Sequence, residues 1–189
     1  MFFSRKKHAP RSPAPAGDTP APAANDSDTA DTGSGAVALA TFAAGCFWGV
    51  QESFDSLAGV VSTEVGYTGG TLDHPTYEDV CEGGTGHAEA VRVSYDPEQI
   101  SYRTLLRHFL SIHDPTQFNR QGPDVGHQYR SAIFHHSDEQ RELAQGILEL
   151  EQKSGRHKRP VVTEVAAAGQ WWRAEKYHQN YFAARGMAK

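Results

Sequence analysis

The stretch AVALATFAAGCFWGV, residues 36–50, decides the fold because two apolar patterns meet in it at one cysteine. Its first part, AVALATFAA, is a continuous apolar run of strand length, which predicts a buried strand. After Cys46 the apolar residues recur at helical spacing, at Phe47, Val50, Phe54 and Leu57. The sequence therefore predicts a buried strand that passes directly into a helix, with Cys46 at the junction.

The remainder of the chain alternates between strand and helix patterns. Strands are predicted over 60–70, 87–96, 130–136 and 161–168, and helices over 101–112, 137–153 and 170–185. Ser137 with Gln140 matches a capping box. In the last helix Ala174, Tyr177 and Tyr181 would share one face. The order βαββαβαβα predicts an α+β fold, a two-layer sandwich with a ferredoxin-like core plus loop and helix additions.

The first 35 residues differ in composition from the rest of the 189-residue chain. Half of the ten prolines lie within residues 1–22, among Ala, Ser, Asp and Gly. Such a segment buries too little apolar surface to offset the entropy of ordering it. We expect a disordered arm over 1–35 and a single catalytic domain over 36–189. A peptide that docks on a partner is the alternative reading of the arm.

Composition excludes several classes of protein. The net charge of −5 provides no positive surface for nucleic acid. No apolar run is long enough to span a bilayer, and MFFSRKKHAP is not followed by the apolar segment of a secretory signal. Two cysteines in 189 residues fit a reducing compartment. We therefore expect a cytoplasmic protein without membrane contact, acting as a monomer.

Cys46 is the first candidate for chemistry. A thiol at a helix N-terminus lies close to the positive end of the helix dipole and to free backbone N–H groups, and both favour the thiolate. This is the environment of a nucleophile. A small buried packing residue explains the position equally well at this point.

Glu89 is the second candidate. In the strand over 87–96 the two-residue period places Glu89 on the face that carries Val91, Val93 and Tyr95. Burial on that apolar face would raise the carboxyl pKa and suit a general acid. The alternative is a solvated carboxylate at the end of the sheet.

Two polar loops accompany these candidates. The loop over 74–89 contains Tyr77 and Cys81, and the loop over 119–132 contains Asp124 and Tyr129. Loops of this length in a compact domain are often functional. The tyrosine hydroxyls could donate to a substrate oxygen, or each ring could simply pack with its hydroxyl in water.

Several motifs together resemble the A-type peptide methionine sulfoxide reductases. They are GCFWG (45–49), GYTGG (66–70), PTYEDVCEGGTGHAEAV (75–91) and GPDVGHQYRSAIF (122–134), with YDPEQISYRTLL and AEKYHQNYF in support. The resemblance extends over about residues 38–182 in the expected order. It implies an enzyme of protein repair under oxidative stress, which reduces methionine S-sulfoxide, free or in peptides, without metal or organic cofactor.

The resemblance also implies a role for each site residue. Cys46 would attack the sulfoxide sulfur and become a sulfenic acid, and Glu89 would protonate the oxygen. Tyr77 and Tyr129 would hydrogen-bond that oxygen, while Asp124 would organise its loop and a water. Phe47 and Trp48 would enclose the S-methyl group, because a flat apolar wall suits a thioether-like side chain.

The chain departs from the family pattern after its last motif. Many members carry resolving cysteines in a glycine-rich tail, and ARGMAK contains none. Thioredoxin, glutaredoxin or a small thiol would then reduce the sulfenic acid directly. Cys81 is the alternative resolving thiol, and otherwise we expect it to be a buried packing residue. His127 replaces a common threonine and is expected to be solvated.

Other classes of function remain as alternatives. A cysteine–histidine hydrolase would use Cys46 with His87 or His127 as base. A zinc-binding domain would take ligands from His135, His136 and the two cysteines, although no Cys-x-x-Cys or His-x-x-x-His spacing occurs. A binding module without catalysis leaves the grouping of Cys46, Glu89 and the two tyrosines unexplained.

Overall fold

The computed structural model describes residues 36–187. The arm predicted for residues 1–35 lies outside this part, so the division into arm and domain stays a prediction. The described strands are β1 (Ala38–Ala44), β2 (Val60–Thr68), β3 (Ala88–Tyr95), β4 (Arg120–Gln121), β5 (Asp124–Val125), β6 (Ser131–His135), β7 (Glu164–Ala167) and β8 (Trp172–Arg173). The α-helices are α1 (Phe47–Asp55), α2 (Tyr77–Glu82), α3 (Tyr102–Ser111) and α4 (Asp138–Lys153).

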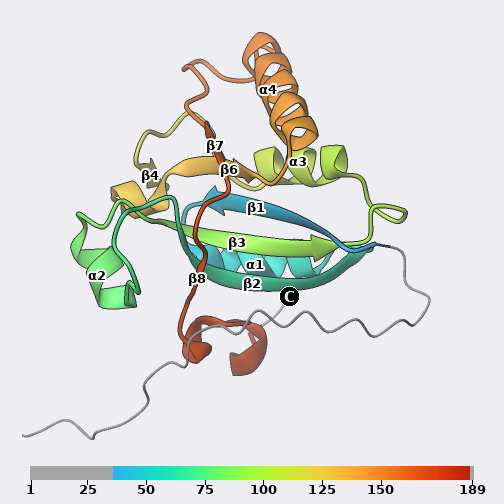
Figure 1. Cartoon of the computed structure of the whole chain (residues 1–189). Coiled ribbons are helices and arrows are strands. Elements are labelled where there is room, and N and C mark those ends of the chain that lie inside the picture. Colours follow the sequence, from blue (N-terminus) through green and yellow to red (C-terminus); the bar gives the residue numbers. More distant parts are fainter. Residues whose placement is uncertain (1–35, 188–189) are drawn as a thin grey trace, which may run out of the picture. The chain divides into compact units, whose positions relative to one another are not determined.

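Six strands form one mixed sheet in the order β7-β6-β1-β3-β2-β8 (Figure 1). β7 runs parallel to β6, and the other neighbouring strands in this sheet are antiparallel. Within it, β1-α1-β2-β3-α3-β6 makes a βαββαβ unit with spatial order β6-β1-β3-β2, which is the ferredoxin-like arrangement. The predicted α+β class is confirmed. β4 and β5 pair separately as a short hairpin.

The helices α1 and α3 cover the same face of the sheet. Phe42 of β1 stacks on Phe54 of α1 with ring centroids 5.1 Å apart and on Phe109 of α3 at 5.2 Å. Aromatic rings at these distances add packing energy beyond their buried area. The alternating apolar residues of β1 therefore hold both helices against one layer, as expected for a two-layer sandwich.

The opposite face of the sheet is lined by small residues. Ala43, Ala90 and Ala132 cluster there with Phe134 and with Trp171 of the C-terminal segment. Figure 1 shows this segment crossing the sheet between β7 and β8. Small side chains allow a chain to lie close to a sheet, so the alanine surface brings the C-terminal segment to the far edge, beside β2.

The helix predicted over 170–185 is wrong. The segment forms β8 and then two short 3-10 helices, η2 (Lys176–His178) and η3 (Ala183–Arg185). Ala174 donates its N–H to the Val65 carbonyl at 3.0 Å, and the Gln179 side chain bonds both the N–H and the carbonyl of Val65. Pairing with the β2 edge thus satisfies the polar groups that a helix would have paired internally. Ala174 is 3% exposed and Tyr177 53%, so they do not share a face.

The capping box predicted for α4 forms only in part. Ser137 Oγ accepts a hydrogen bond from the Gln140 N–H at 3.2 Å, as expected of an N-cap residue. The Gln140 side chain, however, accepts from the His136 N–H at 2.9 Å rather than from that of Ser137. The helix begins where predicted, but the side chain of Gln140 bonds the backbone N–H of the residue before the N-cap instead of that of the N-cap itself.

We expect Gly66→Ala to loosen the C-terminal segment. A Cβ at Gly66 would lie 2.4 Å from the Trp172 carbonyl oxygen and 2.6 Å from the Trp171 ring. Because the backbone oxygen cannot move without breaking the pairing of β8, the free energy of unfolding should fall by about 1–3 kcal/mol. Urea unfolding and limited proteolysis between residues 170 and 187 measure this effect.

Gly146→Ala in α4 is the matched control. A Cβ there meets nothing within 4 Å. Alanine in a helix interior should raise the free energy of unfolding by about 0.5–1 kcal/mol. A Gly66→Ala variant as stable and as protease-resistant as the unmodified chain would show that β8 pairing contributes little.

Candidate active site

Cys46 occupies the N-cap position of α1, directly after the buried strand. Gly45 makes the turn with a φ of +89°, and a Cβ there would lie 2.6 Å from the Gln121 Cβ. Glycine is therefore required at position 45 for two reasons: its positive φ and the close approach of the Gln121 side chain. The backbone N–H groups of Trp48 and Gly49, in the first turn of α1, lower the pKa of the Cys46 thiol. The predicted strand–cysteine–helix junction is present.

The ionisation of Cys46 differs from the expectation. Burial, with smaller contributions from the negative charges of Glu89 and Asp124, raises the thiol pKa to about 11. The hydrogen bonds from Trp48 and Gly49 act in the opposite direction but are outweighed. The helix N-terminus does favour the thiolate, as predicted, but burial and the two negative charges outweigh this effect in the free protein. The sulfur carries its proton at neutral pH.

Glu89 lies against the same helix end. Its side chain is 2% exposed, and its Oε2 accepts a hydrogen bond from the Phe47 N–H at 3.1 Å. Burial raises the carboxyl pKa to about 7, and the charge of Asp124 contributes further. The predicted apolar environment is confirmed, and the alternative of a solvated carboxylate is wrong. A carboxyl with this pKa can donate a proton near neutral pH.

Tyr77 begins α2, a helix that the sequence reading missed. Thr76 caps it by accepting the Asp79 N–H at 3.2 Å, and the Asp79 carboxylate accepts the Thr76 N–H at 2.9 Å. This reciprocal capping box was readable in the letters TYED. The hydrogen bond of the Tyr77 hydroxyl to the Cys81 thiol raises the pKa of Tyr77, as do burial and the charge of Glu89. The hydroxyl therefore keeps its proton and remains a donor.

The loop after α3 supplies Asp124 and Tyr129. Asp124 lies in β5, and Tyr129 ends the 3-10 helix η1 (His127–Tyr129). Burial raises the Tyr129 pKa to about 12, with further contributions from the charges of Glu89 and Asp124. Asp124 likewise acts on Cys46 and on Glu89. Glu89 is thus within electrostatic reach of every other member of the predicted set, namely Cys46, Tyr77, Asp124 and Tyr129.

Phe47 and Trp48 follow the cysteine on α1 and differ in exposure. Phe47 is 1% exposed and packs against Tyr67, whereas Trp48 is only partly buried. The Trp48 indole N–H donates to His178 Nδ1 at 3.0 Å, and its ring stacks on Tyr181 with centroids 3.7 Å apart. Trp48 therefore has a fixed orientation beside Cys46.

Glu175 and His178 were not singled out from the sequence. Glu175 accepts the Tyr77 N–H at 2.9 Å and the Tyr67 hydroxyl at 2.9 Å, so it ties α2 and β2 to the C-terminal segment. Because His178 Nδ1 accepts from Trp48, its Nε2 carries the proton, and burial lowers the pKa of the ring. The motif AEKYHQNYF contains both residues and could have indicated them. The prediction of a helix over 170–185 gave the wrong orientation for its side chains, so it did not show which of them face the site.

Comparison with known proteins identifies the family. The family model "Peptide methionine sulfoxide reductase" matches residues 38–188. The chain belongs to this family. It is 58% identical to the peptide methionine sulfoxide reductase MsrA of Geobacter sulfurreducens over 147 residues, which are 78% of this chain and 91% of that protein. Membership makes the chain an oxidoreductase and confirms the resemblance.

Solved structures agree with this assignment. Mxr1 of Saccharomyces cerevisiae in reduced form aligns with a TM-score of 0.73 and 37% identity, over 81% of this chain and 88% of that one. Mxr1 in complex with Trx2 aligns with a TM-score of 0.53 and 28% identity, over 82% and 91%. The family and these neighbours support thiol-dependent reduction of methionine sulfoxide.

The second cysteine of this reductase is exposed rather than buried. Cys81 lies on α2, where its sulfur accepts a hydrogen bond from the Tyr77 hydroxyl. The alternative that Cys81 is a buried packing residue is therefore wrong. His127 is exposed and bonds Asn119 at 3.2 Å, as expected of a solvated loop histidine.

In the described part of the chain, one of the two candidate bases of a hydrolase and the zinc site find no support. The ring nitrogens of His87 bond the Gly70 N–H at 3.1 Å and the Leu72 carbonyl at 2.8 Å, which leaves no nitrogen free to act as a base. Within residues 36–187 no group of three or more His, Cys, Asp or Glu side chains could hold a metal ion. Nor does this part contain a helix long and apolar enough to cross a membrane.

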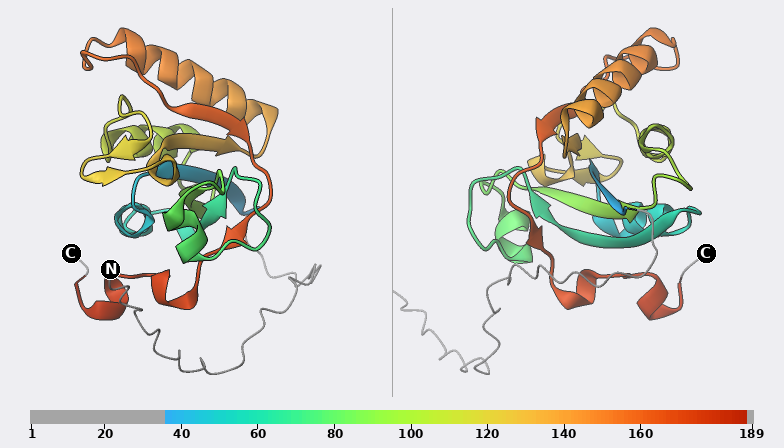
Figure 2. Two further views of the ribbon diagram at one scale, coloured as in Figure 1. Left: turned by 90° about the vertical axis from the view of Figure 1, so that its left-hand side faces the viewer. Right: turned by 45° about the vertical axis from the view of Figure 1, so that its right-hand side comes forward.

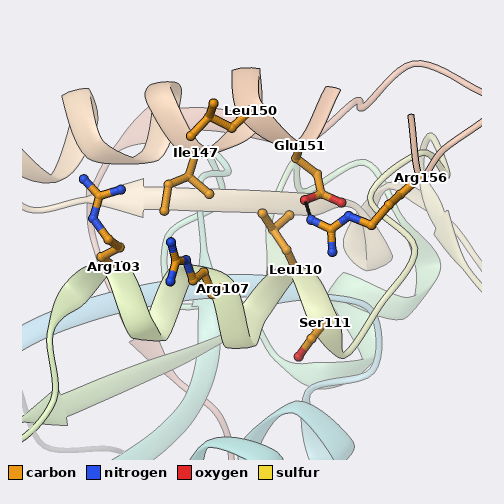
Figure 3. A pocket seen from close by; sticks show the side chains of 8 residues that line it. All are labelled: Arg103, Arg107, Leu110, Ser111, Ile147, Leu150, Glu151 and Arg156. Carbon is orange, nitrogen blue, oxygen red and sulfur yellow. Dashed lines mark hydrogen bonds and ion pairs between the residues drawn. The ribbon is translucent and has the colours of Figure 1, made fainter. Parts of the chain in front are cut away.

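A separate hollow of about 390 Å³ lies between α3 and α4. Figure 3 shows Arg103 and Arg107 on α3 facing Ile147 and Leu150 on α4. None of the residues that line this hollow belongs to the group around Cys46. It is a feature of the helical layer and takes no part in the site.

Proposed function

We propose that this reductase converts the S epimer of methionine sulfoxide, free or in peptides and proteins, to methionine in the cytoplasm. The observation that carries the proposal is the pairing of Cys46 and Glu89 at one helix end, where the Phe47 N–H binds Glu89 Oε2 at 3.1 Å. Cys46 is the N-cap of α1, and Glu89 of β3 is hydrogen-bonded to the first residue of that helix. A nucleophile and a proton donor so close together can act on two adjacent atoms, the sulfur and oxygen of a sulfoxide.

The first half of the reaction oxidises Cys46 at the expense of the sulfoxide. The thiol loses its proton and its sulfur attacks the sulfoxide sulfur, while Glu89 protonates the oxygen, which leaves as water once a second proton is added. Water then adds to the Cys46 sulfur, and the bond between the two sulfur atoms breaks. The products are methionine and a sulfenic acid on Cys46. The thiol is oxidised and the sulfoxide reduced, with no net uptake of protons. The raised pKa of Glu89 supports this role because the acid must be protonated near neutral pH.

The surrounding side chains bind the two ends of the sulfoxide group. Tyr129 donates a hydrogen bond to its oxygen, and Tyr77 does so when its hydroxyl turns away from Cys81. Asp124 orders the loop that carries Tyr129 together with a water. Phe47 and Trp48 accept the S-methyl group. The hydrogen bond from Trp48 to His178 supports this role of the indole because it fixes the plane of the ring.

An external thiol returns Cys46 to its reduced state. It condenses with the sulfenic acid to give a mixed disulfide and water, and a second thiol then releases Cys46. The complex of the related Mxr1 with Trx2 supports thioredoxin as that partner, ahead of glutaredoxin or a small thiol. Cys81 is the alternative resolving thiol, since it is exposed on the helix that carries Tyr77.

A single turnover without reductant tests the proposal. Reduced protein mixed with methionine S-sulfoxide should release one methionine per chain and gain one oxygen in mass, whereas the R epimer should give none. A loss of two hydrogens instead would mean that Cys46 and Cys81 have formed a disulfide, which would overturn resolution by an external thiol. Absence of methionine would overturn the proposed function.

A further inference from the structure

A hollow of about 490 Å³ lies beside Cys46 on one flank of α1. Gly49 and Ser53 line it from the helix, while Ile112 at the end of α3 and Gln121 of β4 line it from across the gap. Of the residues assigned to the proposed sulfoxide site, only Cys46 lines this hollow. It is therefore a second approach to the same cysteine.

The aromatic wall proposed for the S-methyl group lies on the other flank of α1. Trp48 donates to His178 and stacks on Tyr181, so it faces the C-terminal segment. Ser53 follows Trp48 by five residues, which is about 140° around an α-helix, and its Oγ lies 2.7 Å from His108 Nε2 of α3. In the left view of Figure 2, α1 lies between the β4–β5 hairpin and the C-terminal 3-10 helices. The hollow and the indole are thus on different sides of the helix.

The walls of the hollow are largely apolar. Ala44, Val50 and Ile112 contribute hydrocarbon surface. The amide of Gln121 is already paired, because its oxygen accepts the Asp114 N–H at 3.1 Å and its nitrogen donates to the Asp114 carbonyl at 3.1 Å. The hollow therefore suits a partner that binds by shape and apolar contact rather than by charge.

Gly49 leaves the wall nearest to Cys46 without a side chain. A Cβ at Gly49 would meet no atom of residues 36–187 within 4 Å. The packing of this part of the chain does not require glycine there, and glycine lowers the stability of a helix relative to alanine. Its consequence is an open space three residues from the cysteine.

A mixed disulfide at Cys46 needs such a space. A disulfide holds its two Cα atoms about 4.4–6.8 Å apart, so a protein thiol reaches Cys46 only if its own backbone comes that close. The sulfur of methionine sulfoxide lies beyond two methylene groups, which keep the substrate backbone farther away. A bare wall beside Cys46 thus matters more for a protein thiol than for the sulfoxide.

We propose that this hollow is the docking site for the reactive loop of a protein dithiol of the thioredoxin class. The inference rests on the proposed function, in which an external thiol reduces Cys46. The first thiol of the partner attacks the sulfenic acid, so that an S–S bond forms, the S–O bond breaks, and the hydroxyl leaves as water with the proton of that thiol. The second thiol then attacks the first, which leaves a disulfide on the partner and returns Cys46 with the second proton.

Ser53→Leu tests the docking site because leucine partly fills the hollow. Three rates are measured with the full chain: methionine release in the first turnover, kcat/KM for reduced thioredoxin, and reduction of the sulfenic acid by dithiothreitol. We expect kcat/KM for thioredoxin to fall about tenfold or more, because the partner backbone loses its place. The first turnover and the rate with dithiothreitol, which brings no backbone, should stay within about twofold.

Ser53→Ala is the matched control, since it removes the same contact with His108 Nε2 without filling the hollow. It should keep kcat/KM for thioredoxin. Gly49→Leu places the added bulk nearest to Cys46 and is scored by the ratio of the thioredoxin rate to the dithiothreitol rate. This ratio should fall at least as far as in Ser53→Leu, and it does not depend on the reactivity of the cysteine itself.

An unchanged ratio in both leucine variants would overturn the docking site, as would a loss of the same size in Ser53→Ala. A first turnover slowed for a peptide sulfoxide but not for free methionine sulfoxide, with the thioredoxin rate kept, would assign the hollow to the substrate and also overturn the proposal. Absence of methionine in the first turnover of the unmodified protein would instead refute the proposed function.

Discussion

Replacing Cys46 by serine is expected to lower the rate of methionine formation by roughly 10⁴-fold or more, because a serine hydroxyl is a poor nucleophile toward sulfur and cannot form a sulfenic acid. The substitution changes one atom at the N-cap of α1, so the fold around Glu89 should be preserved. Methionine released in a single turnover, with intact mass of the protein, measures the effect.

Cys81→Ser is the matched control for this prediction. Serine at position 81 still accepts the hydrogen bond from the Tyr77 hydroxyl, and Cys81 takes no part in the first half of the reaction. We expect this variant to release one methionine per chain at a rate within a few-fold of the unmodified protein. If Cys81→Ser lost the first turnover and Cys46→Ser kept it, the nucleophile would be assigned to the wrong cysteine.

Glu89→Gln is expected to lower the single-turnover rate by about 10²–10⁴-fold, the usual contribution of a general acid. Glutamine keeps the size of the side chain and an oxygen that can accept the Phe47 N–H, so the loss reports on the proton rather than on packing. Near-wild-type activity in this variant would mean that another group protonates the sulfoxide oxygen.

The pH dependence distinguishes proton donation from a structural role. The Glu89 carboxyl has a pKa of about 7 and the Cys46 thiol one of about 11, whereas attack needs the opposite distribution, a thiolate beside a protonated carboxyl. Below pH 7 the carboxyl holds its proton, so the rate rises tenfold per unit with the thiolate fraction. Between pH 7 and 11 the growing thiolate fraction is offset by loss of the protonated carboxyl. The rate at low substrate concentration should therefore be level there.

Glu89→Gln should remove this level region. No carboxyl is lost as the pH rises, so the slow residual rate should increase until the thiol itself is ionised. Removal of a negative charge should also lower the Cys46 pKa, which the pH dependence of iodoacetamide alkylation measures. If the variant and the unmodified protein had profiles of the same shape, Glu89 would not be the proton donor.

The sequence by itself predicted those features that depend on local periodicity. The apolar run over 36–44 and the helical spacing after it placed Cys46 at a strand–helix junction, and the two-residue period of β3 placed Glu89 on the buried face. The order of elements was sufficient for the α+β class. These features depend on which way successive side chains point, and that is set by the backbone of one element.

Only the tertiary structure decided the C-terminal segment and the ionisation of the thiol. Residues 170–185 carry apolar residues at helical spacing, but hydrogen bonds to the Val65 backbone are available only once β2 has become a sheet edge. The helix end at Cys46 was readable locally, whereas Glu89 and Asp124 come from β3 and β5. Desolvation and charge sum over all neighbours in space, including those distant in sequence, and at Cys46 that sum outweighs the local effect of the helix.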